Sequence, residues 1–329
     1  GLPMHDPDRE QAIIESIIER NPGPFDDRTI VRLFREILNA SLGHMERTGQ
    51  DGMLVARAPG AQDVRFSVRG WQIGAEPVVV AGPCAVESED QMHEVAAGLA
   101  RLGVGLLRGG AFKPRTSPYS FQGLGVEGLK ILRSAADRHA MAVVTEVMDP
   151  RNVEVVARYA DVLQIGARNM YNYDLLREAG RARRPVFLKR AMSATLDELM
   201  WAAEYVALSG EDRIILCDRG VRTFTRETRN SLDIAAVPLL RRKTALPIAV
   251  DVSHAAGRRD ILVPLARAAL AAGAQMLMVE VHPRPAAARS DASQQLSVEE
   301  FEAMLEDLAA AGLLGPAVRN QDDRVEVRT

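Results

Sequence analysis

The sequence predicts an α/β protein whose main part is a (β/α)8 barrel, a TIM barrel, preceded by a short α-helical segment. From Pro77 onward, eight short apolar runs rich in valine, isoleucine and leucine alternate with stretches of helical period. The runs are apolar throughout rather than alternating, which is typical of parallel strands that helices bury on both faces. Eight such units in about 240 residues fit a closed barrel better than an open sheet.

The composition is that of an ordinary globular enzyme. The chain has 329 residues and a formal net charge of −3, so nucleic acid and membrane surfaces are not expected as partners. No apolar run approaches the roughly 20 residues of a membrane span, and no signal peptide is recognisable at the start. Two cysteines, Cys84 and Cys217, are too few for a disulfide framework. We therefore expect a cytoplasmic enzyme.

The pattern of residues 1–47 predicts two short helices. The segment QAIIESIIER places isoleucines at helical spacing, and NPGPF, with two prolines and a glycine, ends that pattern. A second helix is predicted to begin near Asp27, which is a suitable N-cap residue. Residues 48–63 are polar and rich in glycine, as linkers are. VRFSVRG then alternates like a short strand that leads into the barrel.

The predicted barrel covers residues 64–314. Its eight strands are VVVAG, GLLRGG, AVVTEV, DVLQIGA, PVFLKR, RIILCD, PIAVDVS and MLMVEVH. Stretches of helical period follow them, for example SEDQMHEVAAGLARLG and TLDELMWAAEYVALSG. The helix after the sixth strand has the weakest pattern, because TRNSLDIAAVPLLRRKT contains Pro238. Residues 315–329 are polar and lack periodicity, so a flexible tail is predicted.

Charged side chains gather at the carboxyl ends of these strands, where barrels of this type carry their chemistry. The second strand is followed by Lys113 and Arg115, which prolines at 114 and 118 hold stiffly. Each cation alone has a plain structural interpretation as the partner of a surface carboxylate. Together they predict a site for an anion, which would offset the repulsion of so many like charges around one opening. The strand-end residues are Cys84, Arg108, Glu146, Arg168, Lys189, Arg190, Arg219, His254 and Glu280.

Four residues at this end form a candidate metal-ligand set. Cys84, His254 and Glu280 end the first, seventh and eighth strands, and Asp291 follows the eighth. These strands become neighbours only when the barrel closes, so the metal prediction depends on the fold prediction. One thiolate, one imidazole and two carboxylates suit a borderline divalent ion such as Mn²⁺, Fe²⁺, Co²⁺ or Zn²⁺, and spacing does not choose among these ions. The alternative is a buried cysteine, a core histidine and a carboxylate paired with arginine.

The motifs resemble those of one enzyme family. AGPCAVES, RGGAFKPRTSPYSFQGLG, QIGARN, LKR, IILCDRG, DVSHAAGRRD, VEVHP and SDASQQ are similar to 3-deoxy-D-arabino-heptulosonate 7-phosphate (DAHP) synthase, type I beta class, over about Val64 to Leu308. The resemblance implies condensation of phosphoenolpyruvate with erythrose 4-phosphate and release of phosphate, the first step of the shikimate pathway to chorismate and the aromatic amino acids. It also implies a homotetramer and a divalent metal cofactor, with Mn²⁺ favoured and Co²⁺, Fe²⁺, Zn²⁺ or Cd²⁺ as alternatives.

The same resemblance assigns binding roles to individual residues. The implied metal ligands are Cys84, His254, Glu280 and Asp291. Two residues of the proline-stiffened loop, Arg115 and Thr116, are implied to bind erythrose 4-phosphate. The implied phosphoenolpyruvate contacts are Arg108, Lys113, Gly166, Ala167, Arg168, Lys189 and Arg219.

Three residues are implied to be catalytic, namely Lys113, Glu146 and His254. Lys113 is the expected proton donor to the nascent alkoxide, because it can reach both substrates. Glu146 is expected near the water that adds to the enol, and His254 is shared with the metal site. The implied chemistry joins the phosphoenolpyruvate C3 to the aldehyde carbon, while the cations stabilise the carboxylate and the leaving phosphate.

Two alternatives to this assignment remain. The related 3-deoxy-D-manno-octulosonate 8-phosphate synthase shares the barrel and the enol substrate, but it is typified by KANRSS where this chain has KPRTS. The stiffer clamp suits the shorter, four-carbon aldose phosphate. The second alternative is a barrel that only binds phosphorylated metabolites, and the complete set of ligand and cation positions argues against it.

The N-terminal segment resembles part of an all-helical chorismate mutase domain. HDPDREQAIIESIIERNPGPFDDRTIVRLFREILNASL is similar to the second and third helices of that domain, and its long first helix is not expected here. Asp6, Arg9, Glu10 and Ser41 match mutase site positions, whereas the later site glutamine falls on Met45. We therefore expect a regulatory segment in which Asp6, Arg9 and Glu10 help to bind chorismate or prephenate as a feedback inhibitor. A bifunctional mutase and synthase is the alternative.

Overall fold

A computed structural model of the chain describes residues 7–37, 52–114 and 117–315. The chain divides into two compact units, Gly1–Ala56 and Arg57–Thr329, and each is described by itself. The predicted linker, 48–63, spans the division between the units. The predicted tail, 315–329, lies outside the described residues apart from Gly315.

The first unit contains helices in both places where they were predicted. Helix α1 covers Pro7–Glu19, and a second helical stretch covers 27–37. The cap of the second helix lies one residue earlier than predicted. Asp26, rather than Asp27, accepts a hydrogen bond from the backbone N–H of Thr29 at 2.7 Å. That hydrogen bond stabilises the carboxylate and so lowers the pKa of Asp26.

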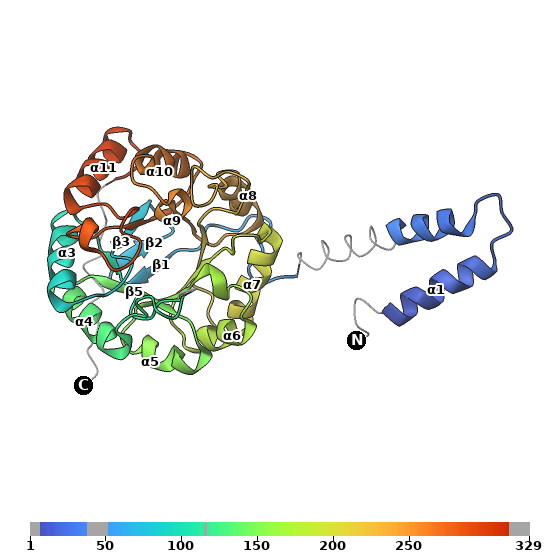
Figure 1. Ribbon diagram of the computed structural model, residues 1–329, viewed down its shortest axis with the longest axis horizontal. Helices are drawn as coiled ribbons and strands as arrows, with labels where there is room; N and C mark the ends of the chain where they lie inside the picture. Colours follow the sequence, from blue (N-terminus) through green and yellow to red (C-terminus); the bar gives the residue numbers. More distant parts are fainter. Residues whose placement is uncertain (1–6, 38–51, 115–116, 316–329) are drawn as a thin grey trace. The chain divides into compact units, whose positions relative to one another are not determined.

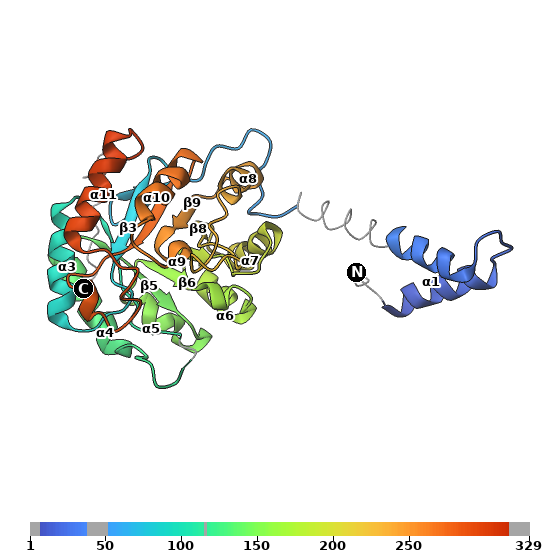
Figure 2. The same ribbon diagram turned by 45° about the horizontal axis from the view of Figure 1, so that its top comes forward.

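Within the described part of the second unit, eight parallel strands form a closed barrel, so the predicted fold class is confirmed (Figures 1 and 2). Neighbouring strands follow the chain order, and the last strand pairs with the first, with Met276 opposite Val78 and Glu280 opposite Gly82. Every strand residue is buried, which accounts for the unbroken apolar runs. The strands are β3 (Val78–Gly82), β4 (Leu106–Arg108), β5 (Ala142–Val147), β6 (Val162–Ile165), β7 (Val186–Lys189), β8 (Ile214–Asp218), β9 (Ile248–Asp251) and β10 (Met276–Glu280).

Helices surround the barrel (Figure 1). Thr195 and Ser297 form capping boxes that satisfy free N–H groups at the starts of α7 and α11. Pro238 lies in the first turn of α8, where no intrahelical bond needs its N–H, so that helix forms despite the proline. The helices are α3 (Glu89–Arg101), α4 (Gly125–Arg138), α5 (Val153–Ala157), α6 (Tyr173–Arg181), α7 (Leu196–Leu208), α8 (Ala236–Lys243), α9 (Val252–Ala256), α10 (Leu262–Ala271) and α11 (Val298–Ala310), with short 3-10 turns η1 (Pro150–Asn152), η2 (Ala167–Asn169) and η3 (Pro285–Ala287).

A hairpin closes the amino end of the barrel, where the sequence suggested a single strand. Strands β1 (Phe66–Val68) and β2 (Trp71–Ile73) pair antiparallel. The turn between them, Arg69 and Gly70, has positive φ at both residues, as tight hairpin turns require. Side chains of both strands join inward-facing residues of the barrel, such as Phe187, in one buried cluster. The hairpin therefore completes the core beneath the carboxyl-end site.

The segment that precedes the hairpin is fastened to the barrel unit. The Arg57 guanidinium contacts the Asp63 carboxylate at 2.5 Å and donates to the backbone oxygen of Thr244 at 3.1 Å. The other oxygen of Asp63 accepts from Arg241 of α8 at 2.7 Å. These contacts place 57–63 in the barrel unit.

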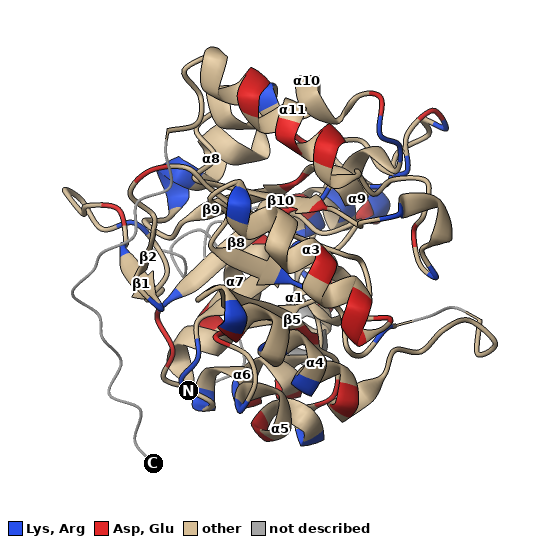
Figure 3. Cartoon of the chain, turned by 90° about the vertical axis from the view of Figure 1, so that its left-hand side faces the viewer, with Lys and Arg blue, Asp and Glu red and all other residues tan. Residues whose placement is uncertain are grey.

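The outer surface carries charges of both signs. Acidic and basic residues are interspersed along outer helices such as α4 (Figure 3). Exposed ion pairs such as that between Arg267 and Asp307, at 2.6 Å, contribute only about 0–1 kcal/mol each. None of the described helices is both long enough and apolar enough to cross a membrane.

Gly105 should be needed for packing of the hairpin. A Cβ atom at this position would lie 2.0 Å from Cε2 of the Trp71 indole, so Gly105→Ala forces the hairpin away from the barrel. We expect a loss of about 1–3 kcal/mol in the free energy of unfolding, seen as a lower Tm in thermal unfolding. Gly315→Ala is the control, because no atom lies within 4 Å of a Cβ there. Equal Tm values for the two variants would contradict this packing.

Candidate metal centre and active site

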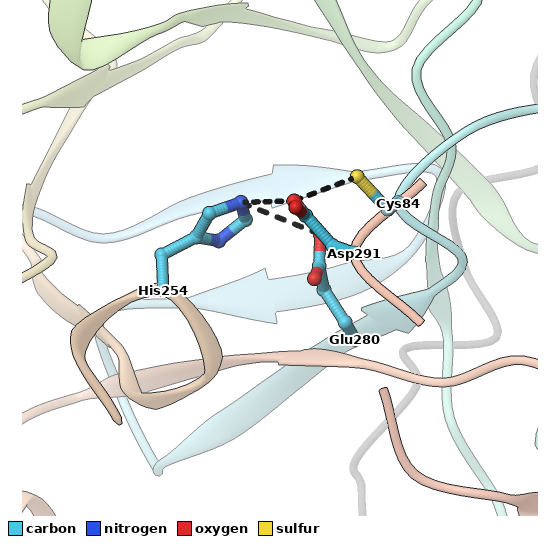
Figure 4. Close-up of side chains that lie close together, drawn as sticks. All are labelled: Cys84, His254, Glu280 and Asp291. Atoms are coloured by element: carbon cyan, nitrogen blue, oxygen red, sulfur yellow. Dashed lines mark hydrogen bonds and ion pairs between the residues drawn. The ribbon is translucent and has the colours of Figure 1, made fainter. Parts of the chain in front are cut away.

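The structure brings together the four residues of the predicted metal-ligand set, Cys84, His254, Glu280 and Asp291. One donor atom from each lies within 4.8 Å of the others (Figure 4). Cys84 Sγ lies 3.3 Å from Asp291 Oδ2, and His254 Nε2 lies 3.4 Å from Glu280 Oε1 and 3.8 Å from Asp291 Oδ2. Cys84 follows β3, His254 lies in α9 just after β9, Glu280 ends β10, and Asp291 lies in the loop before α11.

The protonation states of this group suit a cation. Burial alone would raise the pKa of Glu280, but His254, Arg108 and Lys113 outweigh it and lower the pKa to about 2. Burial lowers the pKa of His254, which favours the neutral imidazole that binds metals. Burial and the nearby Glu280 raise the pKa of Cys84 to about 12. The thiol therefore needs a strong positive charge beside it to ionise.

The donor set fits a divalent ion by its chemistry. A thiol, a neutral imidazole and two carboxylates match the preferences of borderline first-row ions. Asp291 also has a positive φ of 50°, a backbone conformation that is uncommon for residues other than glycine. In this loop Oδ2 of Asp291 lies 3.3 Å from Cys84 Sγ and 3.8 Å from His254 Nε2.

Buried cations lie against the donor group. Arg108 Nη1 is 2.8 Å from Glu280 Oε1, and both side chains are almost fully buried. Lys113 Nζ donates to the Cys84 backbone oxygen at 2.7 Å and lies 3.1 Å from Sγ. Gly110 makes room for this arrangement, because a Cβ there would lie 2.7 Å from the Lys113 side chain. The predicted substrate lysine and the predicted metal cysteine are therefore direct neighbours.

Asp251 is a buried site residue that the sequence interpretation missed. Its Oδ2 lies 2.7 Å from His254 Nδ1 and also accepts a hydrogen bond from Lys189 Nζ. Burial by itself would raise the pKa of Asp251, but His254 and Lys189 outweigh it and hold the pKa well below its usual range. The available signal was the spacing Asp-x-x-His, in which Asp251 also caps the backbone N–H of His254. Asp251 turns Nε2 of the imidazole toward the other donors.

The cations predicted around the opening divide into two classes. Arg190 is neutralised by Asp218 at 3.1 Å and Asp233 at 2.8 Å, so it does not act as a free cation. No ion pair among the described residues involves Arg168 or Arg219, and Nη1 of Arg219 is buried without a hydrogen-bond partner there. Burial, together with the neighbouring Arg229 and Arg168, lowers the pKa of Arg219, and the nearby Asp251 offsets this only in part.

A cavity of about 450 Å³ lies beside these groups, although Cys84, Glu280 and Arg190 are not among its lining residues. It is large enough for small phosphorylated metabolites and opens at the carboxyl ends of the strands. The predicted residues that line it are Arg108, Lys113, Glu146, Gly166, Ala167, Arg168, Lys189, Arg219, His254 and Asp291. Lining residues that the sequence interpretation did not identify are Pro114, Ser117, Ser120, Gln164, Met192, Arg222, Arg229 and Asn230.

Comparison with known proteins assigns the barrel to a family. A profile described as the DAHP synthetase I family matches residues 65–312. The chain belongs to the DAHP synthetase I family. Enzymes of this family are generally metal-dependent, and the four-donor group is the candidate position for that ion. A second profile, chorismate mutase type II, matches residues 1–46.

Named relatives agree with this assignment. Phospho-2-dehydro-3-deoxyheptonate aldolase from Thermotoga maritima is 53% identical over 284 residues, covering 86% of this chain and 84% of that protein. Its crystal structure, described as a DAHP synthase, aligns with a TM-score of 0.77 and 49% identity, covering 80% of this chain and 78% of that one. A 2-dehydro-3-deoxyphosphooctonate aldolase from Fusobacterium nucleatum is 33% identical over 247 residues, covering 69% of this chain and 87% of that protein.

Close packing fixes the carboxylate of Glu146 in the DAHP synthetase cavity. Glu146 ends the inward side of β5 and is 8% exposed. A Cβ on Gly166 would lie 2.0 Å from Glu146 Oε1, so only glycine lets the carboxylate lie there. Gly166 and Ala167 both line the cavity, and the substrate contacts that the resemblance implies for them remain predictions.

Some predicted residues lie outside the part of the chain that the structure describes. These are Arg115 and Thr116 of the clamp, and Asp6 and Ser41 of the N-terminal segment. The backbone of Arg9 and Glu10 lies in α1. The roles of these residues remain predictions.

Proposed function

We propose that the chain condenses phosphoenolpyruvate with erythrose 4-phosphate and water, forming DAHP and releasing phosphate. The observation that carries this proposal is a cavity that two members of the four-donor group, His254 and Asp291, line together with Arg168 and Arg219. Neither arginine has an ion-pair partner among the described residues, and Nη1 of Arg219 is buried without a hydrogen-bond partner there. Phosphoenolpyruvate carries a phosphate and a carboxylate, and erythrose 4-phosphate carries a phosphate. Both substrates therefore supply anionic groups that can pair with these arginines. Family membership gives independent support.

Binding of phosphoenolpyruvate is assigned to the cations deep in the cavity. Arg168 and Arg219 bind its phosphate, and Lys189, Arg108 and Lys113 neutralise its carboxylate and bridging oxygen. Cations that are held in place before substrate arrives stabilise the substrate's charge without rearrangement. Lys189 and Arg108 already contact Asp251 and Glu280, which fixes their positions in advance.

Carbon–carbon bond formation joins C3 of phosphoenolpyruvate to the aldehyde carbon of erythrose 4-phosphate. When bound, a divalent ion supplies a Lewis acid for the aldehyde oxygen. Lys113, held between the donor group and the cavity, gives a proton to the alkoxide that forms. Glu146 accepts a hydrogen bond from the water that adds at C2, after which the C2–O bond to phosphate breaks. His254 contributes through the donor group, and Asp251 fixes its orientation.

The choice of ion is part of the proposal, and the mixed donor set supports it. Mn²⁺ is our favoured ion because two carboxylates and an imidazole suit it, and the single thiolate makes Co²⁺, Fe²⁺, Zn²⁺ and Cd²⁺ the alternatives. In the same proposal Arg115 and Thr116 bind the phosphate of erythrose 4-phosphate, and Ser117, the next residue in the sequence, lines the cavity. We further propose a cytoplasmic homotetramer, on the strength of the family resemblance.

Substrate choice tests the proposed reaction. Phosphate release from phosphoenolpyruvate should show a kcat/KM roughly 100-fold higher with erythrose 4-phosphate than with arabinose 5-phosphate, because the clamp excludes the longer aldose. A coupled phosphate assay with each aldose measures this ratio. A preference for arabinose 5-phosphate would favour octulosonate synthesis, the activity named for the Fusobacterium relative. Release with neither aldose would favour the non-catalytic binding protein.

We propose that the N-terminal unit, which matches chorismate mutase, inhibits the synthase when chorismate or prephenate binds, with Asp6, Arg9 and Glu10 among the contacts. Met45 stands where the mutase family has a hydrogen-bonding glutamine, so stabilisation of the mutase transition state should fail before ligand binding does. A bifunctional enzyme is the alternative.

Shortening the chain to Arg57–Thr329 should remove this inhibition. The shortened protein keeps the contacts of Arg57 and Asp63 with the barrel unit, so it should fold and retain synthase activity. Rates with and without prephenate, measured for both lengths, check the expectation, and mutase turnover of the full chain is measured alongside. Equal inhibition at both lengths would place the regulatory site in the barrel, and rapid mutase turnover would support the bifunctional alternative.

A further inference from the structure

Gln294 is buried beside the donor group and uses both ends of its side-chain amide. It lies in the loop between β10 and α11 and is 2% exposed. Its Nε2 donates to Glu280 Oε2 at 2.5 Å, and its Oε1 accepts from Arg229 Nη1 at 3.0 Å. The amide must have this orientation, because a carboxylate needs a donor and a guanidinium needs an acceptor.

The two oxygens of Glu280 have different partners, because Gln294 binds only one of them. Oε2 is occupied by the amide. Oε1 is the oxygen that faces the other donors, 3.4 Å from His254 Nε2, with Arg108 Nη1 at 2.8 Å. Rotation of the carboxylate would break the hydrogen bond between the Gln294 amide and Glu280, both of which are buried, and leave a buried polar group without its partner.

Arg229 likewise contacts only one of the two oxygens of Asp291. Its Nη1, which donates to Gln294, also lies 3.4 Å from Asp291 Oδ1. The other oxygen, Oδ2, is the one near Cys84 Sγ at 3.3 Å. We call Glu280 Oε2 and Asp291 Oδ1 the outer oxygens, because the other oxygen of each carboxylate faces the donor group. Arg229 Nη1 contacts Asp291 Oδ1 directly, and through Gln294 it is linked to Glu280 Oε2.

We infer that Gln294 is a positioning residue for the metal centre. Together with Arg229 it holds the outer oxygens of Glu280 and Asp291, so that each carboxylate presents one oxygen to the ion. Single-oxygen ligation leaves more positions open for substrate than ligation through both oxygens. The inference rests on the proposed metal site, and it adds a residue that touches neither the ion nor the substrate.

The test compares two buried glutamines in the full-length chain. Gln294→Met keeps the side-chain volume but removes the donor to Glu280 and the acceptor for Arg229. Gln275→Met is the matched control: Gln275 is 7% exposed and hydrogen-bonds Gly74 and Ile248 at the opposite end of β10. Mn²⁺ affinity is measured by calorimetry, and the visible absorption of the Co²⁺-loaded proteins reports the ligand geometry.

Mn²⁺ affinity should fall by about 10- to 100-fold in Gln294→Met, with a changed Co²⁺ spectrum. In Gln275→Met it should stay within about twofold of the parent, even though the lost hydrogen bonds lower Tm. Gln294→Asn keeps the amide, but its side chain is one methylene too short to reach both partners, so it should behave like Gln294→Met. It replaces the methionine variant if that variant does not fold. Unchanged affinity and spectrum in a folded Gln294 variant overturn the inference. Failure of the parent protein to bind Mn²⁺ or Co²⁺ would instead overturn the metal site itself.

Discussion

Closure of the barrel between β10 and β3 is the constraint on which the site depends. Glu280 pairs with Gly82, just before Cys84, and the next pairing, of β9 with β10, brings His254 alongside. In an open sheet with this sequential strand order the first and last strands would lie at opposite edges, and the four donors would not meet. The hairpin β1–β2 supports this closure from the amino end, where it fills the core beneath the strands. Fold and chemistry therefore follow from one strand pairing.

The balance of buried charge explains why the site is ready for anions. Glu280 is paired with Arg108, and Asp251 with Lys189, so each of these buried acids has a partner. Burying an ion pair requires desolvation free energy that the attraction between the charges does not always offset. Such pairs are therefore found where they fix the geometry of a functional site. Arg219, in contrast, keeps a buried nitrogen without a partner among the described residues. The protein thus neutralises its own acids and leaves part of its positive charge for the substrates.

The sequence predicted the features that are set by residues at the carboxyl ends of strands, because a parallel barrel places all of these ends on one face. It therefore located the donor set, the cavity cations and the strand order. It did not show that Arg190 would turn to Asp218 and Asp233, since pairing depends on side-chain packing. Gln294 and Arg229 were missed for a related reason. Neutral amides and loop arginines carry no periodic signal, and their role appears only when two loops meet.

The account is tested most directly by the rate of phosphate release from phosphoenolpyruvate and erythrose 4-phosphate in two cysteine variants saturated with Mn²⁺. Cys84 and Cys217 are both buried thiols at strand ends, but only Cys84 belongs to the four-donor group. Cys84→Ala should abolish turnover while the fold remains intact, and Cys217→Ala should keep most of it. Full activity of Cys84→Ala, with or without a chelator, would contradict the proposed metal centre.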